Sequence, residues 1–340
     1  MTSQSTDTAV KDVAIIGAGP VGLFAIFECG MLGLSTHVID ALPEIGGQCT
    51  ALYPEKPIYD IPAYPEIMAE DLIEKLEAQA KPFNPTYHLN QQVTALTKDE
   101  DTWLLETSIG NTIKAKTIII AGGGGSFGPN RPPLENIEEY EGTSIFYMVQ
   151  KKTDFADKDV VIAGGGDSAV DWAISLSDIA KSITVVHRRD KFRAAPTSVT
   201  QLQDLAERGK INLCTPYQLS RLAGDSSQLD AVIVKGKDGE EKSIKANILL
   251  PFYGLAMDLG PINDWNLDLQ KSQIQVDPTT CQTSAQGIYA IGDIATYDNK
   301  LKLILTGFSE AAFAAHAIYK VIHPDTPLHF EYSTTKGMPQ

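Results

Sequence analysis

The sequence is poor in cysteine, in basic residues and in long apolar runs, and each shortage argues against a class of protein. Its four cysteines form no C-x-x-C pair, which argues against a zinc knuckle and a dithiol centre: Cys29, Cys49, Cys214 and Cys281. The 28 lysines and arginines stand against 43 aspartates and glutamates, a net charge of −15 that argues against a nucleic-acid-binding protein. No apolar run reaches the ~18 residues of a membrane-spanning helix, and the polar N-terminus does not resemble a signal peptide. We therefore expect a cytoplasmic protein with reduced thiols.

A dinucleotide-binding pattern stands near the N-terminus of the 340-residue chain, which is long enough for about two domains. The pattern runs strand, glycine loop, helix, strand and acid: residues 13–16, GAGPVG at 17–22, 23–32, 36–39 and Asp40. Three glycines permit a tight turn, approach to a pyrophosphate and close helix packing: Gly17, Gly19 and Gly22. Asp40 follows at close to the ~20-residue spacing of an acid that accepts ribose hydroxyls. This ending predicts FAD, because its adenosine ribose carries no phosphate.

The pattern returns in the second half of the chain with a different ending. It comprises a strand, a glycine loop, a helix and a second strand: residues 158–163, GGGDSA at 164–169, 169–177 and 182–186. Arginines follow where the first unit has its acid, and a forked guanidinium suits a 2′-phosphate. The pattern therefore predicts an NADP site, although the arginines could instead form a solvated basic face. The predicted binding residues are Gly164, Gly166, Ser168, Ala169, Arg188, Arg189 and Arg193.

Two dinucleotide sites predict hydride transfer between NADPH and FAD. This transfer requires no acid–base side chain, so no catalytic residue is assigned. The histidines lack metal-ligand spacing, so no metal site is expected.

Connecting segments predict how the two units are joined. The strand at 117–121 opens into four glycines at 122–125, and apolar residues at 248–254 indicate the return crossing. The motif IYAIGD ends at Asp293, and a helix over 308–321 follows. We expect Asp293 to bind the ribityl chain of FAD, or else to act only as a helix N-cap. The fold is thus predicted as α/β with two Rossmann-like domains, an NADP domain (125–254) inserted into a discontinuous FAD domain (1–124 and 255–340).

The motifs together resemble those of the low-molecular-weight thioredoxin-reductase-like flavoproteins over nearly the whole chain: GAGPVG, GGQ, GGGDSA, HRRDKFRA and IYAIGD. Phe146 and Val149 stand about where thioredoxin reductases carry their two cysteines, so a dithiol relay is not expected. The segments ALYPEK (51–56) and IYD (58–60), with an extension over 330–340, resemble the type 2 ferredoxin–NADP reductase branch.

That resemblance implies a homodimer with one FAD per subunit and electron transfer between NADPH and ferredoxin or flavodoxin. It implies that Tyr53 covers one face of the flavin ring and that a tail at 332–334 lies near the other. The FAD contacts it implies are Val21, Asp40, Gln48, Tyr53, Val93, Phe127, Asp293 and Thr334.

An acidic ferredoxin would need a local basic patch on this acidic protein. The candidates are equally consistent with a scattered solvated surface: Lys151, Lys152, Lys158 and Arg131. Two other functions stay open: a flavin, quinone or disulfide reductase that uses NADPH, and a non-catalytic flavoprotein that senses NADPH.

Overall fold

The chain divides into two compact units in the computed structural model, which describes residues 9–225, 228–328 and 337. Unit 1 comprises residues 1–127 and 257–340, and unit 2 comprises residues 128–256. The predicted α/β class, with one unit inserted into a discontinuous other, is confirmed. The return crossing comes later than the sequence suggested. The apolar run begins with β16 (Ile248–Pro251), a strand of the unit 2 sheet, and the chain leaves along β17 (Leu255–Asp258), which pairs with β9 (Ser126–Pro129).

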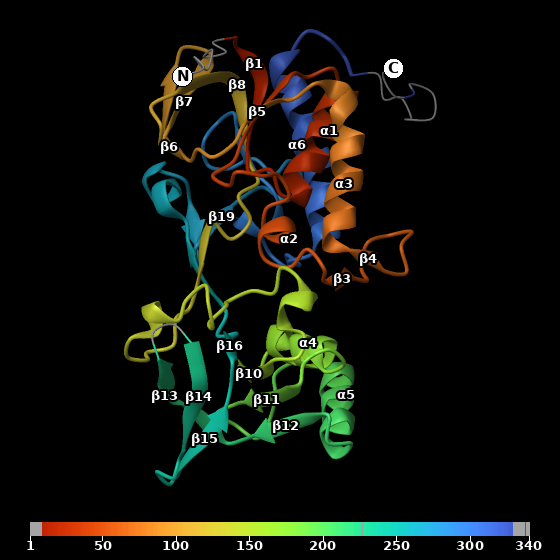
Figure 1. The fold of residues 1–340 in the computed structure, drawn as a ribbon. Coiled ribbons are helices and arrows are strands. Elements are labelled where there is room, and N and C mark those ends of the chain that lie inside the picture. Colours follow the sequence, from red (N-terminus) through yellow and green to blue (C-terminus); the bar gives the residue numbers. More distant parts are fainter. Residues whose placement is uncertain (1–8, 226–227, 329–336, 338–340) are drawn as a thin grey trace, which may run out of the picture. The chain divides into compact units, whose positions relative to one another are not determined.

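Unit 1 is built on a seven-stranded sheet of order β5-β2-β1-β8-β7-β6, in which β20 also pairs with β8 (Figure 1). Its strands are β1 (Lys11–Ile16), β2 (Thr36–Ile39), β5 (Thr86–His88), β6 (Val93–Asp99), β7 (Thr102–Thr107), β8 (Thr112–Ile120) and β20 (Ile288–Ala290). The pairs β1–β2, β1–β8, β2–β5 and β8–β20 are parallel, whereas β6 and β7 pair antiparallel. The central strands are apolar at successive positions because they are covered on both faces.

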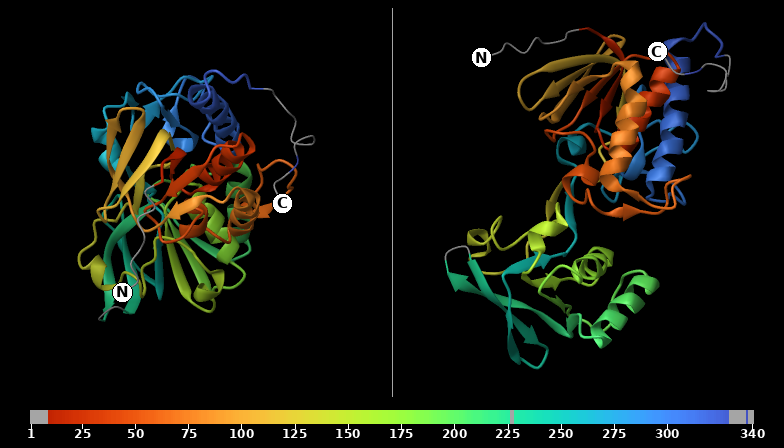
Figure 2. Two further views of the ribbon diagram at one scale, coloured as in Figure 1. Left: turned by 90° about the horizontal axis from the view of Figure 1, so that it is seen from above. Right: turned by 45° about the vertical axis from the view of Figure 1, so that its right-hand side comes forward.

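Three helices lie side by side on unit 1: α1 (Pro20–Met31), α3 (Ala69–Ala80) and α6 (Ile304–Ile322) (Figure 2). Small residues let α6 approach its neighbours closely: Gly307, Ala311, Ala314 and Ala315 are all buried. The sequence pattern suggests a helix from Pro65, but α3 begins only at Ala69. Residues 67–68 form β4 (Ile67–Met68) instead, which pairs with β3 (Pro57–Ile58). Unit 1 also contains a short helix α2 (Gln48–Ala51), a sheet of β18 (Leu269–Gln270), β19 (Gln273–Gln275) and β21 (Ala295–Thr296), and 3₁₀ turns at Lys81–Phe83, Gly260–Asp264 and Gly292–Ile294.

Unit 2 combines a parallel and an antiparallel sheet. The parallel sheet has the order β12-β11-β10-β16, and the additional strands are β10 (Asp159–Ala163), β11 (Ser182–Val186) and β12 (Ile211–Cys214). Helices α4 (Asp167–Leu176) and α5 (Pro196–Glu207) pack together. The antiparallel sheet β13 (Tyr217–Asp225), β14 (Gln228–Gly236) and β15 (Glu241–Lys245) was not predicted. Across the described ranges, no helix of either unit has the length and apolar character to cross a bilayer.

Candidate functional site

The first glycine loop brings α1 against β1 at a distance that excludes side chains. A Cβ atom placed on Gly22 would lie 2.0 Å from the carbonyl oxygen of Gly17, and one on Gly17 would lie 2.4 Å from the carbonyl oxygen of Ala121. Helix α1 begins at Pro20, directly after its N-cap residue Gly19. The backbone amides of its first turn therefore face the end of β1, where an anion would be stabilised.

Asp40 lies just beyond β2 and is fixed by two backbone amides. Its Oδ2 accepts a hydrogen bond from the amide of Ala18 at 2.6 Å, and its Oδ1 accepts one from the amide of Leu42 at 2.8 Å. Burial raises the pKa of this carboxyl, and the amide bonds oppose the rise. A carboxylate offers about four acceptor positions, so the group can still bind a hydroxyl.

A cleft at the carboxyl ends of β1 and β2 gathers most of the residues predicted to bind FAD. It is lined by Gly17, Gly19, Val21, Asp40, Gln48, Tyr53, Val93 and Asp293. Gly22 does not line the cleft but packs behind the loop. Phe127 lies in β9 and its side chain is outside the described structure, as is Thr334. Burial raises the pKa of the Tyr53 hydroxyl well above its ordinary value, as expected of an aromatic wall.

Sequence reasoning missed several walls of this cleft: Gln91, Gln92, Ile262, Trp265 and Ile304. The most informative is Trp265, because its Nε1 is buried and has no hydrogen-bond partner. Buried N–H groups are normally satisfied, so an unpaired donor in a cleft wall fits a ligand that carries acceptors. The residues present therefore fit a large nucleotide with an apolar ring system. No local pattern marks Trp265 in the sequence, because its position depends on folding of the 260–265 segment over the cleft.

Asp293 does not cap a long helix. It lies in the 3₁₀ turn Gly292–Ile294, whereas α6 begins at Ile304 with Leu303 as its N-cap residue. The hypothesis that Asp293 acts only as the N-cap of the C-terminal helix is therefore wrong. Ile304, the first residue of α6, does line the cleft, so the start of that helix and the Gly-Asp turn contribute to the same wall.

The second glycine loop lies in unit 2 between β10 and α4, with Gly166 as the N-cap residue of α4. A Cβ atom on Gly165 would lie 2.3 Å from the ring of His187, so the strand end and the loop approach closely. Burial lowers the pKa of His187, whose Nε2 is buried without a partner. The loop is tied to the segment after β11, because the amide of Arg193 donates to the Gly165 carbonyl at 2.7 Å.

The three arginines are all exposed beside this loop: Arg188, Arg189 and Arg193. Within the described part of the chain, none of them forms an ion pair with an acidic side chain. Their charges are therefore available to a phosphate. Ser168 and Ala169 lie in the first turn of α4, the former accessible and the latter buried.

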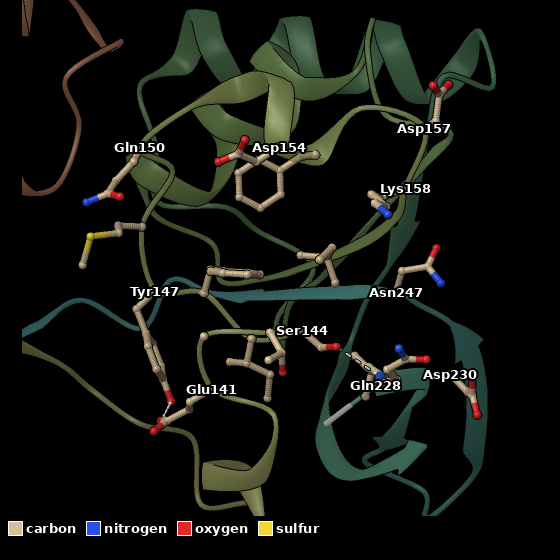
Figure 3. Close-up of a pocket in the computed structure, with 18 of the residues that line it drawn as sticks. Glu141, Ser144, Tyr147, Gln150, Asp154, Asp157, Lys158, Gln228, Asp230 and Asn247 are labelled. Carbon is tan, nitrogen blue, oxygen red and sulfur yellow. Dashed lines mark hydrogen bonds between the residues drawn. The ribbon is translucent and has the colours of Figure 1, made fainter. Parts of the chain in front are cut away.

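A cavity of about 890 Å³ in unit 2 lies away from the glycine loop. Figure 3 shows Tyr147 and Glu141 at one end of it and Asp157, Lys158 and Asn247 at the other. Phe146 lines this cavity and Val149 is buried, so no thiol stands at either position. Arg131 pairs with Glu141 at 2.7 Å, and Asp154 and Asp157 line the same cavity as Lys158. The predicted basic patch is thus partly neutralised.

Comparison with known proteins gives a consistent set of relatives. The model of a family described as "Pyridine nucleotide-disulphide oxidoreductase" matches residues 11–312. A "Ferredoxin--NADP reductase" of Paramagnetospirillum magneticum is 58% identical over 97% of this chain and 98% of its own length. Another, of Rickettsia felis, is 60% identical over 97% of this chain and 98% of its own length.

Solved structures also resemble this chain. A thioredoxin reductase of Lactococcus lactis superimposes with a TM-score of 0.78 at 26% identity, covering 92% of this chain and 99% of the other. A thioredoxin reductase of T. acidophilum gives a TM-score of 0.78 at 25% identity, covering 92% and 98%.

Proposed function

The chain belongs to the pyridine nucleotide-disulphide oxidoreductase family, and from this membership we propose that it is an FAD-dependent ferredoxin–NADP(+) reductase. One observation carries the proposal: relatives with this name match nearly the full chain at 58% and 60% identity. The two glycine loops support the proposal. An acid follows the first and suits a ribose without a phosphate, whereas arginines follow the second and suit a ribose 2′-phosphate, so one chain can hold both FAD and NADP(H).

Each unit has one ligand in this proposal. Unit 1, residues 1–127 and 257–340, binds FAD in the cleft that Asp40, Tyr53 and Asp293 line. Unit 2, residues 128–256, binds NADP(H) at the start of α4. The first-turn amides of α1 and α4 bind the pyrophosphates, Asp40 accepts ribose hydroxyls, and Arg188 and Arg189 bind the 2′-phosphate.

When bound, FAD supplies the conversion between the two-electron chemistry of NADPH and the one-electron chemistry of an iron–sulfur protein. The residues of this chain orient FAD and shield it from water. Tyr53 and Trp265 wall the apolar part of the cleft, Val21 and Val93 exclude water, and the amides at the start of α1 hold negative charge.

Disulfide reduction by an internal dithiol is not supported. The structurally similar thioredoxin reductases share the fold, but here Phe146 and Val149 stand about where a dithiol is expected. All four cysteines are unpaired, and three of them are buried. A reductase of flavins, quinones or external disulfides and a non-catalytic NADPH sensor are the alternatives that an assay must separate.

We further propose that the protein is a cytoplasmic homodimer and that flavodoxin can replace ferredoxin. Exposed apolar side chains along α6, Leu305, Phe313 and Val321, support a partner subunit. Light scattering of the purified protein tests the dimer, and a single-subunit mass would contradict it.

The decisive experiment measures cytochrome reduction by NADPH with the purified, FAD-loaded protein, with and without added ferredoxin. We expect reduction to depend on ferredoxin, and parallel reactions with flavodoxin, a quinone and an aromatic disulfide to define the acceptor. Faster turnover with the quinone or the disulfide than with ferredoxin would overturn the proposal. Slow flavin bleaching by tightly bound NADPH, with every acceptor inactive, would favour the sensor.

A further inference from the structure

A pair of opposite charges is buried in unit 1 beside the Gly-Asp turn. The side chains of Lys300 and Glu310 are only 4% and 3% exposed, and the Lys300 ammonium contacts the Glu310 carboxylate directly. Burying either charge alone is costly, and even a buried pair seldom stabilises more than well-packed apolar residues would. A charged pair at such a position therefore suggests a role other than stabilising the fold.

Glu310 connects three segments through one carboxylate. Its Oε2 accepts the backbone N–H of Gly292 at 2.7 Å, and its Oε1 accepts the hydroxyl of Tyr297 at 2.8 Å together with the Lys300 ammonium. These contacts join the turn that carries Asp293, the loop over 297–300 and the second turn of α6. The Lys300 ammonium also lies 5.3 Å from the ring centre of Tyr297, which adds a cation–π contact.

Close packing transmits this connection to the cleft. Gly292 adopts φ +74°, and a Cβ atom on Gly307 of α6 would lie 2.4 Å from Val21 and 3.3 Å from the Cα of Gly292. The turn, α6 and the start of α1 therefore fit together without room for a side chain. The positions of three residues that line the cleft depend on this packing: Val21, Asp293 and Ile304. A shift of Glu310 would therefore displace part of the cleft wall.

We propose that Glu310 and Lys300 are a charge-compensated positioning pair: their contacts hold the Gly292–Asp293 turn and the start of α6 in place for FAD, and the mutual compensation of their charges keeps the reduction potential of bound FAD at its wild-type value. This inference rests on the proposal that unit 1 binds FAD. Because the two charges cancel, the pair fixes geometry while adding little net charge beside the cofactor. Removing one partner leaves the other as an uncompensated charge in a buried region, where its influence is large.

The test separates the two charges. Glu310→Gln keeps the size and one acceptor of the side chain but leaves Lys300 uncompensated, whereas Lys300→Met leaves Glu310 uncompensated. The double variant removes both charges. Lys302→Met is the matched control, because it removes an exposed lysine from the same segment between β21 and α6.

For each protein we would measure the FAD dissociation constant of the apoprotein and the midpoint potential of bound FAD by dye equilibration. Glu310→Gln is measured at pH 6 and Lys300→Met at pH 8.5, each against wild type at the same pH, so that the remaining charge persists.

We expect opposite shifts. A lone positive charge favours reduced FAD, so Glu310→Gln should raise the ratio of reduced to oxidised affinity about tenfold, which is ~30 mV for a two-electron couple. Lys300→Met should lower the ratio by a similar factor, the double variant should return to within about twofold of the wild-type ratio, and Lys302→Met should not change it.

A merely structural pair would instead weaken FAD binding in both variants without opposite potential shifts. If Lys300→Met does not fold, an unchanged potential in FAD-loaded Glu310→Gln still overturns the proposal. Wild-type apoprotein that binds no FAD would instead contradict the proposed function.

Discussion

The two glycine loops of this chain differ most where the ribose of a bound dinucleotide would lie. In unit 1, β2 leads to Asp40, whose two carboxylate oxygens accept backbone amides of Ala18 and Leu42. In unit 2, β11 leads to Arg188 and Arg189, which are exposed. A pre-ordered, part-buried acid suits a ligand that stays in place, while exposed arginines suit one that must enter and leave. In the proposed assignment, one fold thus holds a resident cofactor and an exchanging substrate by changing the residues at the end of its second strand.

The loops also differ in how closely helix and strand approach. Gly22 leaves no room for a methyl group, since its Cβ would lie 2.0 Å from the Gly17 carbonyl oxygen. The corresponding position of unit 2 is Ala169, which is buried and already carries that methyl group. Unit 1 therefore depends on its third glycine, and unit 2 does not.

The largest effect should come from breaking this close approach. Gly22→Ala should force α1 away from β1, cost about 3 kcal/mol or more, and release FAD, because a backbone carbonyl cannot move aside as a side chain can. The reciprocal change Ala169→Gly should cost about 1 kcal/mol, the usual penalty for glycine inside a helix.

Urea denaturation monitored by circular dichroism, together with the FAD retained after gel filtration, measures both variants. Equal losses of stability in Gly22→Ala and Ala169→Gly would show that the two loops are not different in this respect.

The next effect concerns the acid of unit 1. Asp40→Ala removes the acceptor of two backbone amides and of the ribose hydroxyls, so FAD should bind about 30- to 300-fold more weakly, or ~2–3.4 kcal/mol. NADPH binding should be unchanged. Fluorescence titration of the apoprotein with FAD measures the loss.

Asp12→Ala is the matched control for Asp40→Ala. Asp12 also accepts a backbone amide, that of Ser35 at 2.9 Å, but it does not line the cleft. It should lower stability and leave FAD affinity intact. Finding FMN in the protein as purified, or a folded Asp40→Ala protein that binds FAD normally, would contradict the assignment of this site.

A somewhat smaller effect is expected from the arginines of unit 2. Arg188→Ala or Arg189→Ala should each cost about 1.5–3 kcal/mol of NADPH binding, or roughly tenfold to a hundredfold in affinity, because a charged hydrogen bond to the phosphate is lost. NADH lacks that phosphate and should be affected little. Steady-state kinetics with the two nucleotides measure the difference. Arg221→Ala provides the control, because Arg221 pairs with Glu241 at 2.9 Å in the same unit. Equal weakening of both nucleotides would show that the arginines do not bind the phosphate.

These predictions concern residues that the sequence could identify, because each lies in or directly after a short motif of strand, glycine loop and helix. The strands over 36–39 and 182–186 have the predicted bounds, since consecutive apolar residues bounded by polar ones specify a buried strand. The antiparallel sheet β13–β14–β15 was missed. Its outer strands β13 and β15 are mostly exposed or half-buried and lack a strong apolar pattern, and the buried apolar run at 232–234 marks only β14. Trp265 and the Lys300–Glu310 pair were also missed. Their roles depend on contacts across the fold, and an isolated lysine or glutamate ordinarily indicates only a solvated surface.

The smallest effect, and the sharpest test against a thiol relay, concerns the cysteines of both units. Three are buried in unit 1, where burial raises the pKa of Cys49 to about 11 and of Cys281 to about 12, and raises that of Cys29 further. Burial also raises the pKa of Cys214 in unit 2. A thiol with a pKa near 11 is only about one part in ten thousand thiolate at pH 7, and the thiolate is the reactive form.

Changing each cysteine to alanine should therefore leave electron transfer to ferredoxin unchanged per bound FAD. The comparison must be made per FAD, because Cys49 lines the cleft and its replacement can loosen the cofactor without touching any redox step. Cys214→Ala, in the other unit, controls for this and should leave FAD content at the wild-type level. A variant with full FAD and normal reduction by NADPH that fails only in transfer to ferredoxin would demonstrate a thiol relay. Cysteines outside any C-x-x-C pair would then carry electrons, and the chain would be grouped by chemistry with the disulfide reductases whose fold it shares.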